Sequence, residues 1–441
     1  MNARRGVACA WAIAVAAVAA MLGGCDRREG PGPPAPARNL LLVTIDTLRA
    51  DRLGCYGSRD VATPNLDRLA AEGALAIDAT VHAPLTRPSH VSLFTGRYPA
   101  EHGIRDNIAP ALADNVPTLA TLLSAAGFRT GAFVSSIVLS AQSGLNRGFG
   151  TYSARFEAGA DDARFLNTIQ RRGEETVADA IAWLRGEDRL RQGYGGPPEL
   201  YAKADNRRFA LWVHLYEPHD PYEPPEPYLS QYAGRPYDGE VALSDELVGR
   251  LLHALESARA DSDTLVVVTS DHGEGLGDHD ESTHGYFVYE STLRVPLLFR
   301  GPRIARGVRV APTVRAVDVL PTLLELLGLP AGEQGQAGWS GRSIAASLGG
   351  GPSPEEVATY AESLTPLLHY GWSDLRTIRD GRWKYILAPR PELYDLLRDP
   401  AEQANLVSVQ PARADALRAA LEAQLRAERH APVERAAVPP E

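Results

Sequence analysis

The sequence predicts an α/β protein in which a mainly parallel sheet lies between layers of helices. Short, continuous apolar runs alternate along the chain with segments of helical periodicity, and this alternation is typical of parallel sheets covered on both faces. The chain has 441 residues, 44% of them apolar and 23% charged. This length and composition suit a large packed core and are inconsistent with a low-complexity chain.

The predicted strands are apolar along their whole length, as expected of strands buried on both faces. They are residues 39–45, 129–134, 209–214, 264–269 and 295–299. Helical patterns fall between them, at residues 65–72, 88–94, 116–126, 175–184 and 243–258.

The character of the sequence changes near residue 330. Shorter strand-like pieces follow at residues 358–362, 375–379 and 383–387, which predict a small antiparallel subdomain. Leu417, Leu421 and Leu425 recur every fourth residue and predict a terminal helix. We therefore divide the chain into a leader (1–24), a Pro- and Gly-rich tether (25–38), a catalytic core (39–330), a C-terminal subdomain (331–410), and a terminal helix with its tail (411–441).

The N-terminus has the features of an export signal. Arg4 and Arg5 precede an apolar run at residues 7–22, which is shorter than the roughly 20 residues of a membrane-spanning helix. Leu22-Gly23-Gly24-Cys25 resembles the cleavage box of bacterial lipoproteins, which implies that Cys25 carries lipid. The alternative is an uncleaved N-terminal anchor. Both interpretations predict a membrane-anchored protein facing the periplasm or the cell exterior.

The net charge argues against one class of partner, nucleic acid, and the cysteine content argues against an internal disulfide. The formal net charge of −10 argues against binding to nucleic acid, because phosphate backbones repel an acidic surface. Cys9 lies in the leader and Cys25 is the predicted lipid site, so Cys55 remains alone. A single cysteine forms no internal disulfide.

Polar residues that bind metal ions follow three predicted strands. Asp46 follows the first strand, His214 and His219 follow the third, and Asp271 and His272 follow the fourth. In open α/β sheets, binding sites form beyond the carboxyl ends of the strands. Taken alone, Asp46 is equally well a helix N-cap, and His214 has the pattern of a buried core histidine. Taken together, the clusters predict a metal centre.

A candidate nucleophile lies between the first two clusters. In the segment Pro84-Leu85-Thr86-Arg87-Pro88-Ser89-His90, Pro88 marks a helix start and Gly96 lies just past the helix end. Thr86 is thus expected at the helix N-terminus, where free N–H groups favour an anion. Beside a divalent cation, its hydroxyl can ionise and attack an electrophile. The alternative is that Thr86 only caps the helix.

Taken together, these segments make the sequence resemble the sulfatases, a branch of the alkaline phosphatase superfamily. The matching segments include LLLVTIDTLRADRLGCYG, TPNLDRLAAEG, PLTRPSHVSLFTGRYPAEHGIRDN and SDHGEGLGDHD. The resemblance implies an alkaline-phosphatase-like core, with a large mixed, mainly parallel sheet between helices and a small C-terminal antiparallel subdomain. It implies further that Asp46, Asp271 and His272 bind a divalent metal beside Thr86. His219 corresponds to a histidine that contacts the anion or leaving group, and His284 lies near the position of an anion-binding lysine.

Three departures from the sulfatase pattern concern the reaction itself. Sulfatases carry a cysteine or serine at the Thr86 position, oxidised to formylglycine within a C/S-x-P-x-R signature. Threonine cannot give an aldehyde at Cβ, because that carbon already carries a methyl group. His90 replaces the arginine of the signature, and Thr47 replaces a second metal-binding aspartate. We therefore expect no formylglycine. A threonine nucleophile is typical of phosphoethanolamine transferases, lipoteichoic acid synthases and nucleotide pyrophosphatase/phosphodiesterases.

The leading hypothesis is a metal-dependent hydrolase that cleaves a phosphate or sulfate ester outside the cytoplasm, with a phosphate ester favoured. Thr86 attacks, His219 and His284 bind the anion or a second metal or act as acid and base, and Asn107 donates to a non-bridging oxygen. Zn²⁺ or Mn²⁺ is favoured as the metal, with Ca²⁺ or Mg²⁺ as alternatives. The substrate is a small-molecule, lipid or glycan ester. The other hypotheses are a sulfatase without formylglycine, a phospho-headgroup transferase and a non-catalytic binding lipoprotein.

Overall fold

The computed structural model describes residues 35–156, 170–187, 208–330 and 338–427. The chain divides into two compact units, Met1–Ala35 and Pro36–Glu441, and the helices and strands of the described residues belong to the second. The predicted leader and Cys25 lie outside the described residues. Ala37 is buried and its N–H donates to Leu326, so the folded unit includes the last residues of the predicted tether.

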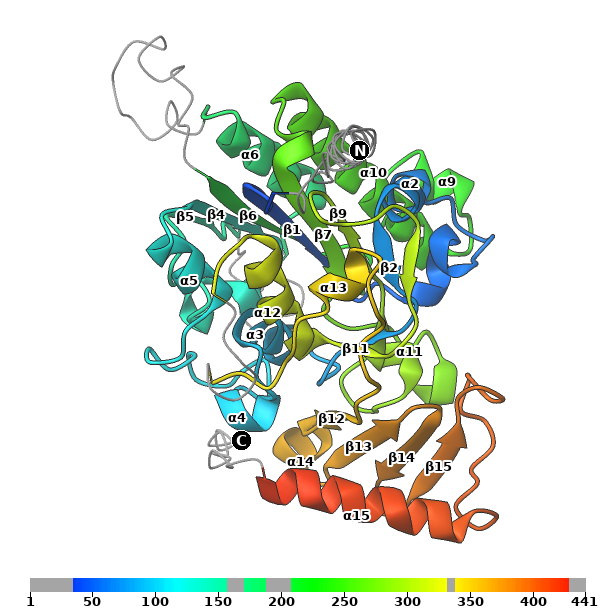
Figure 1. Ribbon diagram of the computed structural model, residues 1–441. Coiled ribbons are helices and arrows are strands. Elements are labelled where there is room, and N and C mark those ends of the chain that lie inside the picture. The colour runs from blue at the N-terminus through cyan, green and yellow to red at the C-terminus, as the bar shows by residue number, and fades with distance from the viewer. Residues whose placement is uncertain (1–34, 157–169, 188–207, 331–337, 428–441) are drawn as a thin grey trace, which may run out of the picture. The chain divides into compact units, whose positions relative to one another are not determined.

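The main sheet has eight strands in the order β10-β2-β9-β7-β1-β6-β4-β5 (Figure 1). β1 (Asn39–Ile45) lies between β6 (Phe209–Leu215) and β7 (Thr264–Ser270) and is parallel to both. β9 (Leu297–Arg300) runs antiparallel to its neighbours β7 and β2, and the other pairs are parallel. The predicted mixed, mainly parallel sheet is thus confirmed. The remaining strands of this sheet are β2 (Ala74–Ala76), β4 (Arg129–Val134), β5 (Thr151–Ser153) and β10 (Val308–Val310).

Helices cover both faces of this sheet, as Figure 1 shows. One apolar core joins α2 (Pro64–Glu72), α6 (Gly173–Leu184) and α10 (Pro236–Ser257) to alternate residues of β1 such as Leu41 and Val43. The other core contains Leu40 and Leu42 of β1 and the helices of the opposite face. Those helices are α3 (Thr86–Thr95), α5 (Leu119–Ala125) and α12 (Ala316–Leu326). Because both faces are buried, the strands are apolar at every position.

The short elements complete the core. A three-stranded sheet has the order β11-β3-β8. Its strands are β3 (Ala79–Thr80), β8 (Arg294–Val295) and β11 (Val314–Arg315). Short helices are α4 (Pro99–His102), α9 (Tyr228–Gln231), α11 (Glu290–Leu293) and α13 (Ala345–Leu348). Single 3₁₀ turns lie at Ala50–Arg52, Gly54–Tyr56, Ile137–Leu139, Ala141–Ser143, Asp261–Asp263 and Asp278–Asp280.

The element boundaries differ from the predicted ones where prolines and polar residues obscure the pattern. The predicted strand at 295–299 is divided at Pro296 between β8 and β9, which lie in different sheets. α10 begins seven residues earlier than expected, because its first turns bury charged side chains such as Asp238 and Glu240 against the core. α12 is a helix that the sequence pattern does not predict, since Pro321 lies inside it.

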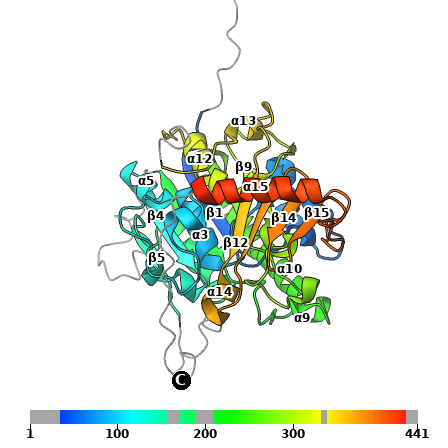
Figure 2. The ribbon, with the colours of Figure 1, turned by 90° about the horizontal axis from the view of Figure 1, so that it is seen from below.

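The C-terminal part forms a separate four-stranded antiparallel sheet, as predicted. Its order is β12-β13-β14-β15. In Figure 2 the terminal helix α15 (Pro411–Ala427) crosses these strands, and its residues Leu417 and Leu421 are buried. α14 (Thr365–Tyr370) follows the first strand. The strands are β12 (Thr359–Ser363), β13 (Leu375–Asp380), β14 (Trp383–Leu387) and β15 (Glu392–Asp395).

Buried ion pairs join this subdomain to the core. The Arg105 guanidinium donates through Nε to Glu362 Oε1 at 2.6 Å and through Nη2 to Oε2, with both side chains almost fully buried. Lys384, also buried, lies 2.9 Å from carboxylate oxygens of both Glu290 and Glu402. Among the helices within the described residues, none combines the length and apolar character needed to cross a bilayer.

We expect Arg105→Met to lower the free energy of unfolding by about 3–5 kcal/mol, because it leaves the Glu362 carboxylate buried without its partner. Urea denaturation of the full chain measures this change. Arg418→Met is the matched control, since Arg418 pairs with Asp415 at an exposed site, and its effect should stay within about 1 kcal/mol. Equal effects of the two substitutions would contradict the role given to the Arg105–Glu362 pair.

Candidate active site

Three neighbouring strands bring the predicted polar clusters to one edge of the main sheet. In the register of the sheet, Ile45 at the end of β1 is level with Leu215 of β6 and Ser270 of β7. The residues that follow these strands therefore meet at the carboxyl edge. Ser270 fixes the junction, since its hydroxyl donates to the Ile45 carbonyl at 2.6 Å and accepts from the Leu48 N–H at 3.0 Å.

Asp46, Asp271 and His272 form a fully buried group whose ligand atoms converge. His272 Nε2 lies 3.5 Å from Asp46 Oδ1 and 3.6 Å from Asp271 Oδ2. Among the described residues, both oxygens of Asp46 and Oδ2 of Asp271 have no hydrogen-bond partner. The other oxygen of Asp271 accepts from the His272 N–H at 3.0 Å, so the free oxygen faces the histidine ring.

The electrostatics of this group favour a cation. Burial raises the pKa of both Asp46 and Asp271, because charged carboxylates lose their hydration in the interior. Burial opposes charge on His272 as well, but Asp271 and Asp46 raise the pKa of its imidazole above the ordinary value. A buried carboxylate is stable when it is paired or binds a metal. A bound divalent ion would supply the positive charge that these two lack.

The spacing of the donor atoms also fits a metal ion. Two ligand atoms that each lie about 2.1 Å from a tetrahedral Zn²⁺ are separated by about 3.4 Å. The observed separations within the group are 3.5 and 3.6 Å, and Thr86 Oγ1 lies 3.3 Å from His272 Nε2. Asp46, Asp271, His272 and Thr86 are therefore the residues that would hold the ion.

Thr86 is the first residue of α3, and all ten residues of this helix are buried. The alternative, that Thr86 caps the helix, is wrong. Leu85 occupies the N-cap position without a side-chain hydrogen bond, so the helix begins two residues before Pro88. The Thr86 hydroxyl is thus free of a capping bond and is directed at His272. The Ser89 hydroxyl donates to the Asp271 carbonyl and joins the helix to the end of β7.

His219 and His284 extend the cluster of histidine rings that begins at His272. The ring centroids of His272 and His284 are 4.3 Å apart, and those of His284 and His219 are 5.0 Å apart. His219 Nδ1 donates to the Asp220 carbonyl at 2.6 Å, and His284 Nδ1 lies 3.1 Å from Glu274 Oε1. These bonds leave Nε2 of each ring as a lone-pair acceptor. Burial lowers the pKa of His219 to about 4 and that of His284 well below its ordinary value, so both rings are neutral bases.

Glu274 is a site residue that the sequence reasoning missed. Its side chain is fully buried, and one carboxylate oxygen orients the His284 ring through Nδ1. A carboxylate behind a histidine commonly fixes its tautomer and direction in metal sites. The signal was its place two residues after His272, within SDHGEG. An acidic residue in a glycine-rich loop is also typical of a solvated turn, so the sequence pattern did not reveal that Glu274 contacts His284.

His90 and His214 contact the candidate metal ligands. We use the term metal-ligand group for those candidates, Asp46, Asp271, His272 and Thr86. His90 Nδ1 donates to the Thr86 carbonyl at 2.7 Å, and its Nε2 accepts from the Thr44 hydroxyl at 3.0 Å. His214 is buried, as its pattern predicted, but neither ring nitrogen has a hydrogen-bond partner in the part of the chain that the structure describes. Its Nε2 lies 3.5 Å from Asp46 Oδ2.

The side chains of Asn107 and Thr47 each form a hydrogen bond with a backbone group. The Asn107 side-chain oxygen accepts from the Arg87 N–H at 2.9 Å, at the start of α3, so only its NH₂ group can donate to a substrate oxygen. The Thr47 hydroxyl donates to the Pro218 carbonyl at 2.7 Å. That bond uses the hydroxyl hydrogen of the residue that stands in place of the second aspartate of the sulfatase pattern.

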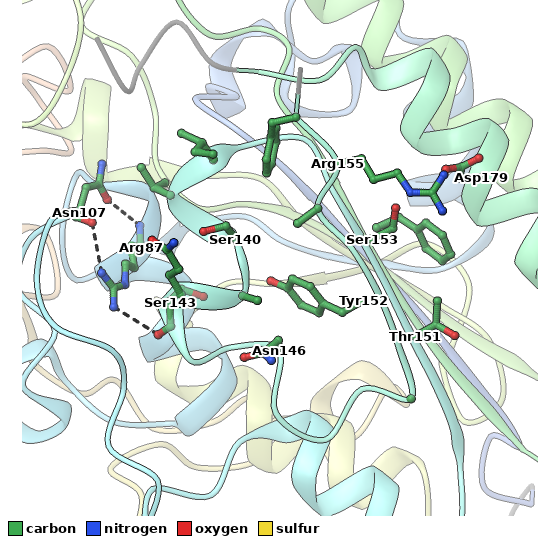
Figure 3. Close-up of a pocket in the computed structure, with 18 of the residues that line it drawn as sticks. Arg87, Asn107, Ser140, Ser143, Asn146, Thr151, Tyr152, Ser153, Arg155 and Asp179 are labelled. Carbon is green, nitrogen blue, oxygen red and sulfur yellow. Dashed lines mark hydrogen bonds between the residues drawn. The ribbon is translucent and has the colours of Figure 1, made fainter. Parts of the chain in front are cut away.

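A cavity of about 1160 Å³ lies beside α3 but outside the metal-ligand group. Figure 3 shows Arg87 and Asn107 on one wall and Tyr152 further along it. Arg87 donates to carbonyls of the surrounding loops, Ser143 among them at 3.2 Å. Since none of its described lining residues belongs to the metal-ligand group, we do not regard this cavity as the reaction site.

The fold and the buried group define an α/β ester hydrolase with a candidate metal centre. The chain belongs to the sulfatase family, whose sequence model (Sulfatase) matches residues 38–329. It is 26% identical to a Delta 4,5-hexuronate-2-O-sulfatase of Bacteroides thetaiotaomicron, over 83% of this chain and 84% of that protein. It is also 26% identical to a choline-sulfatase of Rhizobium meliloti, over 83% and 82% of the two chains.

Solved structures share the fold. A 2-O GAG sulfatase superposes with a TM-score of 0.69 at 23% identity, over 89% of this chain and 92% of that one. A phosphonate monoester hydrolase of Agrobacterium radiobacter gives a TM-score of 0.69 at 22% identity, over 89% and 96% of the two chains. At this level of identity the likeness establishes a common fold.

We expect His214→Ala to weaken the affinity for a divalent metal by about 10- to 100-fold without removing the site, because outer partners of metal ligands have effects of this size. Competition with a chelator measures the dissociation constant. His253→Ala is the control, since that histidine side chain is 78% exposed. An unchanged affinity would remove His214 from the site. Complete loss of binding at saturating metal would make His214 a ligand.

Proposed function

We propose that this protein hydrolyses phosphate esters and that Thr86 is the nucleophile. The observation that carries the proposal is the position of the Thr86 hydroxyl, buried at the N-terminus of α3 and 3.3 Å from His272 Nε2. Free N–H groups at a helix N-terminus favour an anionic group, which suits a phosphoryl group in transfer. A divalent cation held by Asp46, Asp271 and His272 beside the hydroxyl would favour its ionisation.

The identity of residue 86 supports phosphate over sulfate. Formylglycine requires an aldehyde at Cβ, and the methyl group of threonine prevents one. A threonyl ester can be resolved only by attack of water on phosphorus or sulfur, as in phosphohydrolases that use a hydroxyl nucleophile. His90 also takes the place of the arginine in the sulfatase signature, and its two ring nitrogens bond Thr86 and Thr44.

The proposed reaction has two steps. Thr86 Oγ1 forms a bond to phosphorus while the bond from phosphorus to the alcohol oxygen breaks. The hydroxyl proton passes to Nε2 of His219 or His284 and then to the departing alcohol. Water next attacks phosphorus, the Thr86–phosphorus bond breaks, and Thr86 regains a proton as inorganic phosphate leaves. A divalent cation held by Asp46, Asp271 and His272 would lower the pKa of the hydroxyl and stabilise charge on phosphate oxygens.

A sulfate ester is the second candidate substrate. The observation in its favour is that two relatives at 26% identity are sulfatases by name, a Delta 4,5-hexuronate-2-O-sulfatase and a choline-sulfatase. The phosphonate monoester hydrolase that shares the fold is by its name an enzyme of phosphorus chemistry, which favours the first candidate, a phosphate ester. An alkoxide can attack either centre, so the nucleophile alone does not decide between them.

We further propose that the protein is an exported lipoprotein. Arg4 and Arg5, the apolar run at 7–22 and the sequence Leu22-Gly23-Gly24-Cys25 support this location. Lipid on Cys25 would hold the hydrolase at a membrane surface facing the periplasm or the cell exterior. Incorporation of labelled palmitate, lost in Cys25→Ala, tests this proposal.

We expect Thr86→Ala to lower kcat/KM on 4-nitrophenyl phosphate by at least about 10³-fold, because it removes the attacking oxygen. Thr86→Ser keeps the hydroxyl and should retain measurable turnover. Metal content, measured in parallel, shows whether the alanine variant still binds an ion at Asp46, Asp271 and His272. Full activity of Thr86→Ala with the ion bound would exclude Thr86 as the nucleophile.

We expect kcat/KM to be higher for 4-nitrophenyl phosphate than for 4-nitrophenyl sulfate, and removal of metal with a chelator to abolish both activities. Re-addition of Zn²⁺, Mn²⁺, Ca²⁺ or Mg²⁺ one at a time identifies the ion that restores turnover. A sulfate rate above the phosphate rate would favour the second candidate. Activity that survives complete removal of metal would exclude the metal centre from the reaction.

A further inference from the structure

The loop that carries His284 runs from the end of β7 to the start of α11 and is closed by backbone hydrogen bonds. At its base the Gly275 N–H donates to the Thr283 carbonyl at 2.6 Å. Further along, the Gly277 N–H donates to the Glu281 carbonyl at 2.8 Å. The residue directly before His284 is thus tied to the start of the loop.

The turn that follows His284 is held by the side chain of Glu281. Its Oε1 accepts from the Tyr286 N–H at 2.9 Å and from the Phe287 N–H at 3.1 Å. The Glu281 side chain is buried, with 4% of the residue exposed. Because the two donors belong to consecutive residues, one carboxylate oxygen fixes the direction in which the chain leaves His284.

Gly285, between His284 and these two donors, is held from outside the loop. Its carbonyl accepts from the hydroxyl of Ser363 in β12 at 2.6 Å. Its φ is +101°, and a Cβ there would lie 3.2 Å from the side chain of Leu85. Leu85 is the N-cap residue of α3 and directly precedes Thr86. The backbone at His284 therefore packs against the start of the helix that carries the proposed nucleophile.

The buried position is costly for the Glu281 carboxylate. Its second oxygen, Oε2, is buried and has no hydrogen-bond partner among the residues that the structure describes. A buried carboxylate that is only partly hydrogen-bonded destabilises a fold, and an apolar side chain would fill the same space without this cost. What Glu281 provides that an apolar residue could not is the pair of bonds to the turn.

The ring that this turn directs lies in the candidate active site. The His284 ring centroid is 4.3 Å from that of His272, whose Nε2 lies 3.3 Å from Thr86 Oγ1. Glu274 holds the His284 ring through Nδ1 at 3.1 Å. That bond orients the ring only while the backbone of His284 is in place, and Glu281 bonds the backbone. The two carboxylates therefore act on different parts of the same residue.

We propose that Glu281 is a positioning residue for His284, and that its carboxylate holds the following turn so that the His284 ring faces the group reacting at Thr86. The proposal rests on the proposed ester hydrolysis at Thr86. It adds to that reaction a residue that contacts neither the substrate nor the metal-ligand group. Loss of Glu281 displaces His284, one of the two proposed bases, without removing it.

A double-mutant cycle tests the proposal, with kcat/KM on 4-nitrophenyl phosphate as the measured quantity. We expect Glu281→Ala to lower kcat/KM about 10- to 100-fold, because a displacement of about 1 Å in an active site has effects of this size. In the His284→Ala protein the same substitution should change kcat/KM less than about 2-fold, since the residue that it displaces is absent. Glu281→Gln keeps an oxygen that can accept both N–H groups, and it should restore most of the activity.

Asp245→Ala is the matched control. Asp245 is also buried, and its carboxylate likewise accepts from two consecutive backbone N–H groups, those of Asn65 at 3.2 Å and Leu66 at 2.8 Å. We expect it to lower the melting temperature, as Glu281→Ala does, and to leave kcat/KM unchanged. Glu281→Met, which has a similar volume and no strong acceptor, replaces the alanine variant if that protein does not fold.

The ¹⁵N spectrum of the histidine side chains records the His284 ring without turnover, and its signals are identified by their absence from the His284→Ala protein. We expect these signals to shift in Glu281→Ala and to stay in place in Asp245→Ala. Unchanged signals in Glu281→Ala would overturn the proposal. So would an equal loss of kcat/KM with and without His284, or a Glu281→Gln protein no more active than Glu281→Ala. Failure of the proposed function gives a different result, namely a wild-type protein that turns over no ester, and the His284 signals then decide the role of Glu281.

Discussion

The structure depends on the burial of two carboxylates, Asp46 and Asp271, at the ends of two adjacent parallel strands. Within the group only His272, whose pKa they raise, can carry a balancing charge, and among the described residues three of their four oxygens have no hydrogen-bond partner. Such an arrangement is costly unless a metal ion completes it. The parallel register of β1 and β7 makes the arrangement unavoidable, because it places the residues after Ile45 and Ser270 at the same level.

The elements around this pair serve to hold it. Ser89 of α3 bonds the Asp271 carbonyl, which sets Thr86 against His272. His90 on the next turn bonds the Thr86 carbonyl. The histidines of the outer loops are oriented by Nδ1 bonds, so that their Nε2 atoms remain free for a proton. The proposed nucleophile, the candidate metal ligands and the proposed bases are thereby held by hydrogen bonds to the backbone of the surrounding elements.

The C-terminal subdomain is held to the core by buried charges. Arg105 of the core pairs with Glu362 of β12, and Lys384 of β14 pairs with Glu290 of α11. Because these side chains are buried, the two parts of the folded unit are joined by interactions that are costly to break singly.

The sequence by itself determined the fold class, the strand ends that bear metal ligands and the candidate nucleophile, because apolar periodicity and residue chemistry are local properties. Tertiary structure alone decided the rest. It showed that Leu85 and not Thr86 is the N-cap, that Glu274 orients His284, and that the two ring nitrogens of His90 bond Thr86 and Thr44. These depend on contacts between distant segments, and a single sequence carries no local signal for such contacts.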